Sequence, residues 1–89
     1  MFDKFLFFKT PMCPNCEEIQ EWIEENQKVK EMGEEVDATT KEGREKAKEY
    51  GVKGVPTIIF TKNGESVATA GSLDEFENII GNKSLKDYE

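Results

Sequence analysis

The chain has 89 residues, a formal net charge of −7, two cysteines and no histidine. This length fits one domain and excludes a barrel enzyme or a two-domain nucleotide enzyme. The lack of histidine excludes a Ser-His-Asp triad, a Cys-His dyad and a His-ligated metal site. Twelve basic residues are scattered among nineteen acidic ones, whereas phosphate binding needs a concentrated basic stripe. We therefore expect the chain to bind neither nucleic acid nor an anionic membrane surface.

The N-terminal segment is apolar but too short for a targeting signal. Its unbroken apolar run is Phe5–Phe8, whereas a secretory core needs about 7–15 apolar residues. No stretch approaches the ~18 apolar residues of a membrane span. Both cysteines lie in one short motif, so they cannot join distant segments as the disulfides of small secreted domains do. We predict a single domain over residues 1–89, monomeric and cytoplasmic.

The first part of the chain predicts a strand followed by a helix. Phe2–Phe8 is aromatic and aliphatic, as in a central strand buried on both faces. Pro11 interrupts this run, and Pro14 suits the first position of a helix because its missing N–H costs nothing there. Apolar residues then recur at helical spacing through about Asn26, in a stripe of Cys16, Ile19, Trp22 and Ile23. We expect Trp22 to pack in the core.

The middle of the chain predicts a short strand and a second helix. Gly33 breaks the chain, and the segment 34–38 is predicted to be an edge strand. Thr39 followed by Glu42 forms a capping box, which predicts a helix over residues 40–50. Gly51 then ends this helix at the position where a left-handed backbone conformation is common.

The last part predicts a β-hairpin and a helix. Val55 and the β-branched run 57–60 form a strand, and Asn63-Gly64 is a strong hairpin signal before a returning strand over 66–70. Ser72 and Glu75 form a second capping box, with a helix predicted to close at Gly81 and a polar, frayed tail over 82–89. The order β-α-β-α-β-β-α predicts an α/β fold, a mixed four-stranded sheet with helices on both faces.

The motif Cys13-Pro14-Asn15-Cys16 carries the chemistry. Residues three apart share one face of a helical turn, so the two sulfurs can approach bonding distance. Cys13 falls at the helix N-cap, where backbone N–H groups and the helix dipole favour a thiolate. The dipole, worth up to ~2 kcal/mol, can move the pKa of a thiol from ~8.5 to around 7. Lys9 favours the thiolate if its side chain turns back, and Glu17 opposes it. We expect a depressed but moderate pKa for Cys13.

These positions predict different roles for the two cysteines. Cys13 attacks a substrate disulfide, and Cys16, on the apolar stripe and less exposed, resolves the mixed disulfide. The same spacing is half of a zinc site, but a closed site needs four ligands, usually Cys or His. Only a dimer sharing four cysteines could hold zinc or an iron–sulfur cluster. For the monomer we predict no metal and no cofactor beyond the redox-active disulfide. Pro11 and Met12 flank the motif, either as loop residues or as an apolar rim for a protein partner.

The segment 8–16, together with Gly54-Val55-Pro56-Thr57 and Gly71, resembles the thioredoxin-like superfamily, specifically its small glutaredoxin-like redoxins. The resemblance implies that Pro56 is cis and faces the cysteine motif. The residues alone also allow a trans proline that begins a strand. A cis Pro56 would leave the backbone of Val55 free to pair with an extended substrate. Thr57 either belongs to this substrate-binding loop or simply fills a strand position.

The resemblance also implies partners. Such proteins are recharged by a reductase, either thioredoxin-reductase-like or the glutathione system, and reduce oxidised target proteins, among which ribonucleotide reductase is one candidate. Lys9 and Gly71 resemble glutathione-binding positions of glutaredoxins, with Asp74 nearby, so glutathione is an alternative cosubstrate. The chain departs from thioredoxins at Met12, where they carry Trp. It also departs at Phe7, where they bury an acid that accepts the proton of the second cysteine.

Overall fold

A computed structural model describes the backbone of residues 2–88 and the side chains of residues 2–80. In this part of the chain, four strands form one sheet in the order β2-β1-β3-β4. Their bounds are β1 Lys4–Lys9, β2 Gly33–Asp37, β3 Thr57–Lys62 and β4 Glu65–Ala70. β1 runs parallel to β2 and antiparallel to β3, and β3 runs antiparallel to β4. The predicted mixed four-stranded sheet is confirmed, with β2 at an edge.

β1 is the central strand, and its side chains alternate between two cores. Phe5 and Phe7 belong to one apolar cluster, whereas Leu6 and Phe8 belong to another on the opposite face of the sheet. All four side chains are buried, which explains why the segment reads as a continuous apolar run. Phe2 precedes the strand rather than belonging to it, and its ring packs against Phe60 with 4.7 Å between ring centroids.

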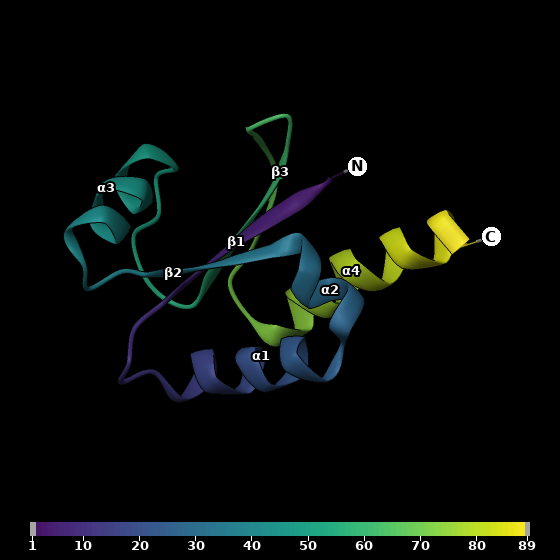
Figure 1. Cartoon of the computed structure of the whole chain (residues 1–89), viewed down its shortest axis with the longest axis horizontal. Helices are drawn as coiled ribbons and strands as arrows, with labels where there is room; N and C mark the ends of the chain where they lie inside the picture. The colour runs from purple at the N-terminus through teal and green to yellow at the C-terminus, as the bar shows by residue number, and fades with distance from the viewer. Residues whose placement is uncertain (1, 89) are drawn as a thin grey trace.

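Helices cover both faces of the sheet, as predicted. On the first face lie α1 (Pro14–Glu25), the short α2 (Gln27–Met32) and α4 (Leu73–Tyr88). On the other face lies α3 (Lys41–Glu49), whose Ala47 packs with the segment after it against the second cluster. Figure 1 shows α1 and α4 on the side of the sheet opposite to α3. No helix in the described residues is long and apolar enough to cross a bilayer.

The helix α2 was not predicted. α1 ends at Asn26, whose φ of −120° and ψ of 84° leave the helical region. The Asn26 side-chain amide donates a hydrogen bond of 2.7 Å to the carbonyl oxygen of Trp22, which terminates the first helix. α2 then begins at the next residue and buries only Val29. Six residues with one buried apolar side chain carry no detectable helical period.

The start of α3 lies one residue later than the predicted capping box. The cap is Thr40, whose hydroxyl accepts a hydrogen bond of 2.9 Å from the backbone N–H of Gly43. Thr39 instead donates from its backbone N–H and its hydroxyl to one carboxylate oxygen of Asp37, over 2.8 and 2.6 Å. Asp37 therefore draws Thr39 into the turn and leaves Thr40 to cap the helix. At the other end, Gly51 has the expected positive φ of 70°.

The hairpin and the last helix follow the prediction at their beginnings. Asn63 and Gly64 have φ values of 54° and 86°, as a tight hairpin turn requires. Ser72 caps α4 by accepting a hydrogen bond from the backbone N–H of Glu75. The predicted end at Gly81 is wrong, because α4 runs on to Tyr88. A glycine costs only about 1 kcal/mol inside a helix and no proline follows it, so Gly81 does not stop the helix.

Gly43 lies inside α3 at a close approach between the helix and the sheet. A Cβ atom at this position would lie 1.8 Å from the carbonyl oxygen of Asp37 and 2.9 Å from the hydroxyl of Thr40. Glycine therefore allows the first turn of α3 to pack on the end of β2, although glycine is an unfavourable helix residue.

Gly43→Ala should lower the free energy of unfolding by about 1–3 kcal/mol, because the added methyl group must displace backbone atoms. In an unconstrained helix the same change would raise stability by up to about 1 kcal/mol. Gly54→Ala is the matched control, since a Cβ there meets nothing within 4 Å. Urea unfolding measures both variants. An unchanged or stabilised Gly43→Ala protein would contradict the close approach.

Candidate functional site

Cys13 is the N-cap of α1, as the sequence predicts. Its φ of −130° and ψ of 100° place it just outside the helix, and Pro14 begins the first turn. The Cys13 sulfur accepts a hydrogen bond of 3.1 Å from the backbone N–H of Cys16. A sulfur thus stands where Ser, Thr, Asp or Asn usually caps a helix. The Cys16 N–H group and the helix dipole both stabilise negative charge on the Cys13 sulfur.

Cys16 lies one turn further along and deeper. The two cysteines form a disulfide with 5.1 Å between their Cα atoms. Cys13 is 9% exposed and Cys16 is 2% exposed, which agrees with the predicted difference in access. Cys16 belongs to the same apolar cluster as Ile19 and Phe76. Cys13 is therefore the more exposed of the two cysteines and is placed to meet a substrate first, and Cys16 is placed to react with a sulfur already bound to Cys13.

The loop 52–56 contributes the second wall of the site. The Val55–Pro56 peptide bond is cis, as the resemblance implied. Val55 is half-buried and packs against the apolar cluster that holds both cysteines. Its backbone makes no hydrogen bond to another described residue. Thr57 begins β3 and donates a hydrogen bond of 2.6 Å from its hydroxyl to the carbonyl oxygen of Gly54. The hydrogen bond from Thr57 thus fixes the loop, and the backbone N–H and C=O groups of Val55 are available to bind another chain.

Lys9 does not turn back toward Cys13. Its ammonium group pairs with the carboxylate of Glu35 on β2 and donates a hydrogen bond of 2.8 Å to the Gln20 side chain on α1. Lys9 therefore connects the end of β1 with the neighbouring strand and helix. It also lines a pocket of about 280 Å³ that reaches Cys16.

The same pocket is lined by three residues that sequence reasoning did not select, which are Thr10, Gln20 and Asp37. Asp37 is the last residue of β2 and is paired in register with Lys9. Hydrogen bonds from the side chain and backbone of Thr39 lower the pKa of Asp37, and the nearby charge of Lys9 acts in the same direction. Desolvation opposes these effects only partly, so the carboxyl group is ionised at neutral pH. The signal in the sequence was a polar residue at the end of a strand parallel to β1.

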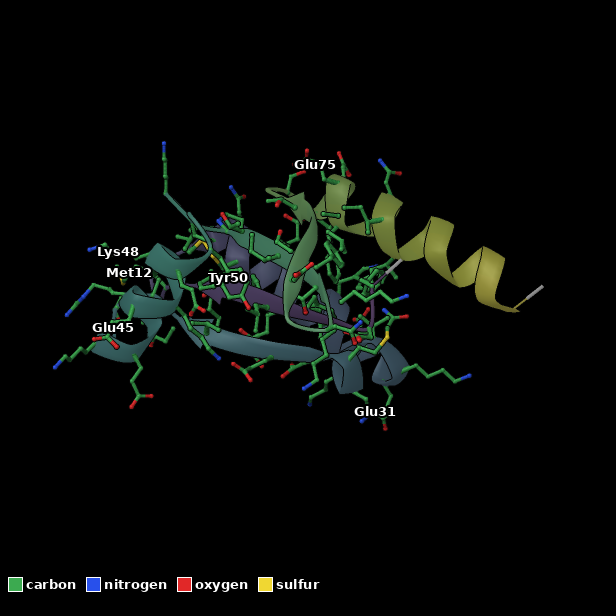
Figure 2. The ribbon with its side chains drawn as sticks, turned by 90° about the horizontal axis from the view of Figure 1, so that it is seen from above. Met12, Glu31, Glu45, Lys48, Tyr50 and Glu75 are labelled. Carbon is green, nitrogen blue, oxygen red and sulfur yellow. A yellow bond between two sulfur atoms is a disulfide. The ribbon has the colours of Figure 1, made fainter. Side chains whose placement is uncertain are left out.

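The remaining predicted site residues lie around the motif in different ways. Met12 is 92% exposed and Pro11 is also exposed. Figure 2 shows Met12 toward the end of the molecule that carries the disulfide, opposite to the C-terminal helix α4. The backbone N–H of Gly71 donates a hydrogen bond of 2.8 Å to the Glu75 carboxylate, within the cap of α4. No cluster of three or more metal-ligating side chains occurs among the described residues.

The hydrogen bond from Cys16 to Cys13 predicts the ionisation of the reduced protein. In a Cys16→Ser variant, which leaves one thiol, thiolate absorbance should titrate with a midpoint below the ~8.5 of free cysteine. The deprotonated fraction, and with it the rate of alkylation by iodoacetamide, should therefore already be substantial at pH 7.5. A midpoint at or above the free-cysteine value would show that the helix N-terminus does not activate Cys13.

The fold of this chain is similar to that of several solved thioredoxin structures. Thioredoxin 1 of Thermosipho africanus superimposes with a TM-score of 0.75 at 21% identity, covering 97% of this chain and 99% of that one. Thioredoxin O2 of Arabidopsis thaliana gives 0.76 at 20% identity, covering 91% and 74%. The thioredoxin pre-protein of Schistosoma mansoni gives 0.72 at 27% identity, covering 88% and 75%. A search of curated protein sequences gave no match.

The comparison with protein families agrees with the structures. The model of the thioredoxin-like domain matches residues 3–82, nearly the whole chain, and includes the cysteine motif, the cis-proline loop and the first turns of α4. The predicted thioredoxin-like fold is thereby confirmed. With its Cys13–Cys16 pair at the N-terminus of α1, this chain belongs to the thioredoxin-like domain family.

Proposed function

We propose that the protein is a thiol–disulfide oxidoreductase that reduces disulfides in other proteins. The observation that carries this proposal is the Cys13–Cys16 disulfide at the N-terminus of α1, in which Cys13 caps the helix and is 9% exposed whereas Cys16 is 2% exposed. This arrangement supports a two-step exchange in which each cysteine has its own task. The family match supports the same reaction class.

The reaction begins from the reduced dithiol. The Cys13 thiolate attacks one sulfur of a substrate disulfide, and the other substrate sulfur leaves as a thiolate. Cys16 then attacks the Cys13 sulfur of the mixed disulfide, which releases the second substrate thiolate and forms the Cys13–Cys16 disulfide. Two electrons pass to the substrate in each cycle. A reductase must return two electrons to the protein before the next cycle.

The cis-proline loop and the rim of the motif are the proposed substrate contacts. The unpaired backbone groups of Val55 beside Pro56 can hydrogen-bond an extended segment next to Cys13, as an added strand would. Met12, with its side chain almost fully exposed next to Cys13, offers an apolar contact that adapts to different partners. Such contacts suit a disulfide in a polypeptide. Pro11 extends this rim, and Thr57 holds the loop in place.

Glutathione is the weaker candidate as cosubstrate. The two groups that resemble glutathione-binding positions are both engaged within the chain. Lys9 pairs with Glu35 and Gln20, and the backbone N–H of Gly71 binds Glu75. An anionic tripeptide would have to break these contacts to use them. The solved structures described above are also thioredoxins. A thioredoxin-type protein reductase is therefore favoured over a glutaredoxin.

A dimer bridged by a metal remains the candidate from another class. It would need both cysteines as thiolates in each subunit, and in the oxidised state described here the disulfide occupies both sulfurs. The mass and the zinc and iron content of the reduced, purified protein distinguish this candidate directly. For the electron carrier we propose a monomer in the cytoplasm, recharged by a thioredoxin-reductase-like enzyme and donating to oxidised proteins, with ribonucleotide reductase as one target to assay.

The two-step scheme predicts opposite effects for the two cysteines. Cys16→Ser should retain its natural target as a mixed disulfide through Cys13, because the resolving thiol is gone. Cys13→Ser, the matched control, should capture at least about tenfold less protein, since the buried Cys16 cannot start the exchange. Mass spectrometry after non-reducing electrophoresis identifies the bound protein. Equal capture by both variants would contradict the assignment of roles.

Substrate class gives a second test. The wild-type protein with a thioredoxin reductase should reduce the disulfides of insulin, whereas Cys16→Ser should lose at least about 90% of this activity because the dithiol cycle stops. Cys16→Ser would keep activity on a glutathione mixed disulfide only if the protein were a glutaredoxin, since that reaction needs one cysteine. Retained activity of this kind would overturn the preference for protein disulfides.

A further inference from the structure

In the second step of the exchange, Cys16 must lose its thiol proton before it can attack the mixed disulfide. Cys16 can attack only as a thiolate. However, Cys16 is only 2% exposed and lies among apolar side chains such as Ile19, Ile23 and Phe76. Among residues 2–80, Thr61 is the one buried polar residue, so no buried acid or base lies near Cys16. Burial in such surroundings also disfavours the thiolate. The thiol proton of Cys16 must therefore have a route by which it is transferred to a group outside this apolar cluster.

The pocket of about 280 Å³ provides that route. It is lined by Cys16 itself and by polar side chains from three elements, Lys9 of β1, Gln20 of α1 and Asp37 of β2. A liquid-water molecule takes about 30 Å³, so several waters fit, and the lining side chains can hydrogen-bond them. The pocket thus brings solvent and one fixed carboxylate to the same space as the buried sulfur.

Asp37 is held in this position from two sides. One of its carboxylate oxygens, Oδ1, accepts both hydrogen bonds from Thr39. Its backbone is paired in register with Lys9 at the end of the β1–β2 ladder. The second oxygen, Oδ2, accepts no hydrogen bond from a described residue, so it is available to a water in the pocket. The hydrogen bonds from Thr39 also lower the pKa of Asp37, so its carboxylate is unprotonated at neutral pH and readily gives up an accepted proton to solvent.

The other charged groups around the pocket are less suited to receive a proton. Glu17 lies on the exposed surface of α1, and no hydrogen bond from a described residue fixes its carboxylate. Glu35 is paired with Lys9. The ammonium group of Lys9 has no lone pair with which to accept a proton. Gln20 does not ionise and is already bound to Lys9. Asp37 is therefore the carboxylate that is both fixed and available.

We propose that Asp37 accepts the proton of Cys16 through water in this pocket when Cys16 resolves the mixed disulfide. This inference rests on the proposed oxidoreductase function. The Cys16 S–H bond breaks, and its proton passes through water to Asp37. The Cys16 sulfur bonds to the Cys13 sulfur, and the bond from Cys13 to the substrate sulfur breaks with its electron pair. The substrate thiolate leaves, and Asp37 passes its proton to solvent.

The test separates the two steps with a chromogenic disulfide. Reduced protein is mixed in stopped flow with substoichiometric 5,5′-dithiobis(2-nitrobenzoate). The first release of the coloured thiolate reports attack by Cys13, and the second release reports attack by Cys16. In Asp37→Asn the second phase should be at least about tenfold slower, the range of general base catalysis, with the first phase unchanged. Asparagine keeps the side-chain oxygen that Thr39 binds.

Rescue distinguishes a proton acceptor from a structural residue. Sodium acetate should accelerate the second phase of Asp37→Asn in proportion to its concentration, with little effect on wild type. Asp37→Glu should recover most of the rate. Asp37→Ser, which keeps a hydroxyl acceptor for Thr39, is a second variant should Asp37→Asn fold poorly, and it should show the same slowing and rescue. Glu34→Gln is the matched control, because Glu34 lies on the same strand, pairs with Lys46 and does not line the pocket.

Three results would overturn the inference. They are a second phase within about twofold of wild type in Asp37→Asn, equal slowing of both phases, and slowing that acetate does not relieve. Slowing in Glu17→Gln without slowing in Asp37→Asn would assign the proton to Glu17 instead. The failure of the proposed function would look different, because the wild-type protein would then release no coloured thiolate in the first phase.

Discussion

The burial of β1 on both faces is the constraint on which the site depends. Phe5 and Phe7 fill one core, and Leu6 and Phe8 fill the other. Each such side chain contributes about 1.5–3 kcal/mol when it is removed from water. With both faces covered, the strand cannot shift in register without moving apolar side chains into the wrong core. The point where the chain leaves the sheet is thereby set, and the cysteine motif begins there.

The N-terminus of α1, the helix that follows β1, binds the reactive sulfur of Cys13. Its cap is a sulfur instead of an oxygen, so the N–H of Cys16 binds the reacting group itself. A single feature thus serves both the stability of α1 and the activation of Cys13. The cis-proline loop completes the site from the far end of the chain, because β3 pairs with β1 and brings residues 55–57 to the strand end beside the motif.

Local chemical signals were predicted well from the sequence. The cysteine motif, the cap at Ser72 and the turn at Asn63-Gly64 each depend on residues close together in the chain, and the structure has all three. The cis geometry of Pro56 came from family resemblance, since a local pattern does not distinguish it from a trans bond. The cap at Thr40 was missed because Asp37 competes for Thr39. The pocket at Cys16 was missed because three separate elements build it.

The contacts of Phe76 have a consequence for the newly made chain. Its ring lies 5.3 Å from those of Phe5 and Trp22 and 5.7 Å from that of Phe60, measured between centroids, so it joins α4 to β1, α1 and β3. These partners emerge from the ribosome before Phe76 does. Until α4 docks, the core around Cys16 lacks one wall, and both thiols are open to oxidants and to other nascent chains. Both cysteines therefore stay unshielded until the part of α4 that carries Phe76 has been synthesised and has docked on the core.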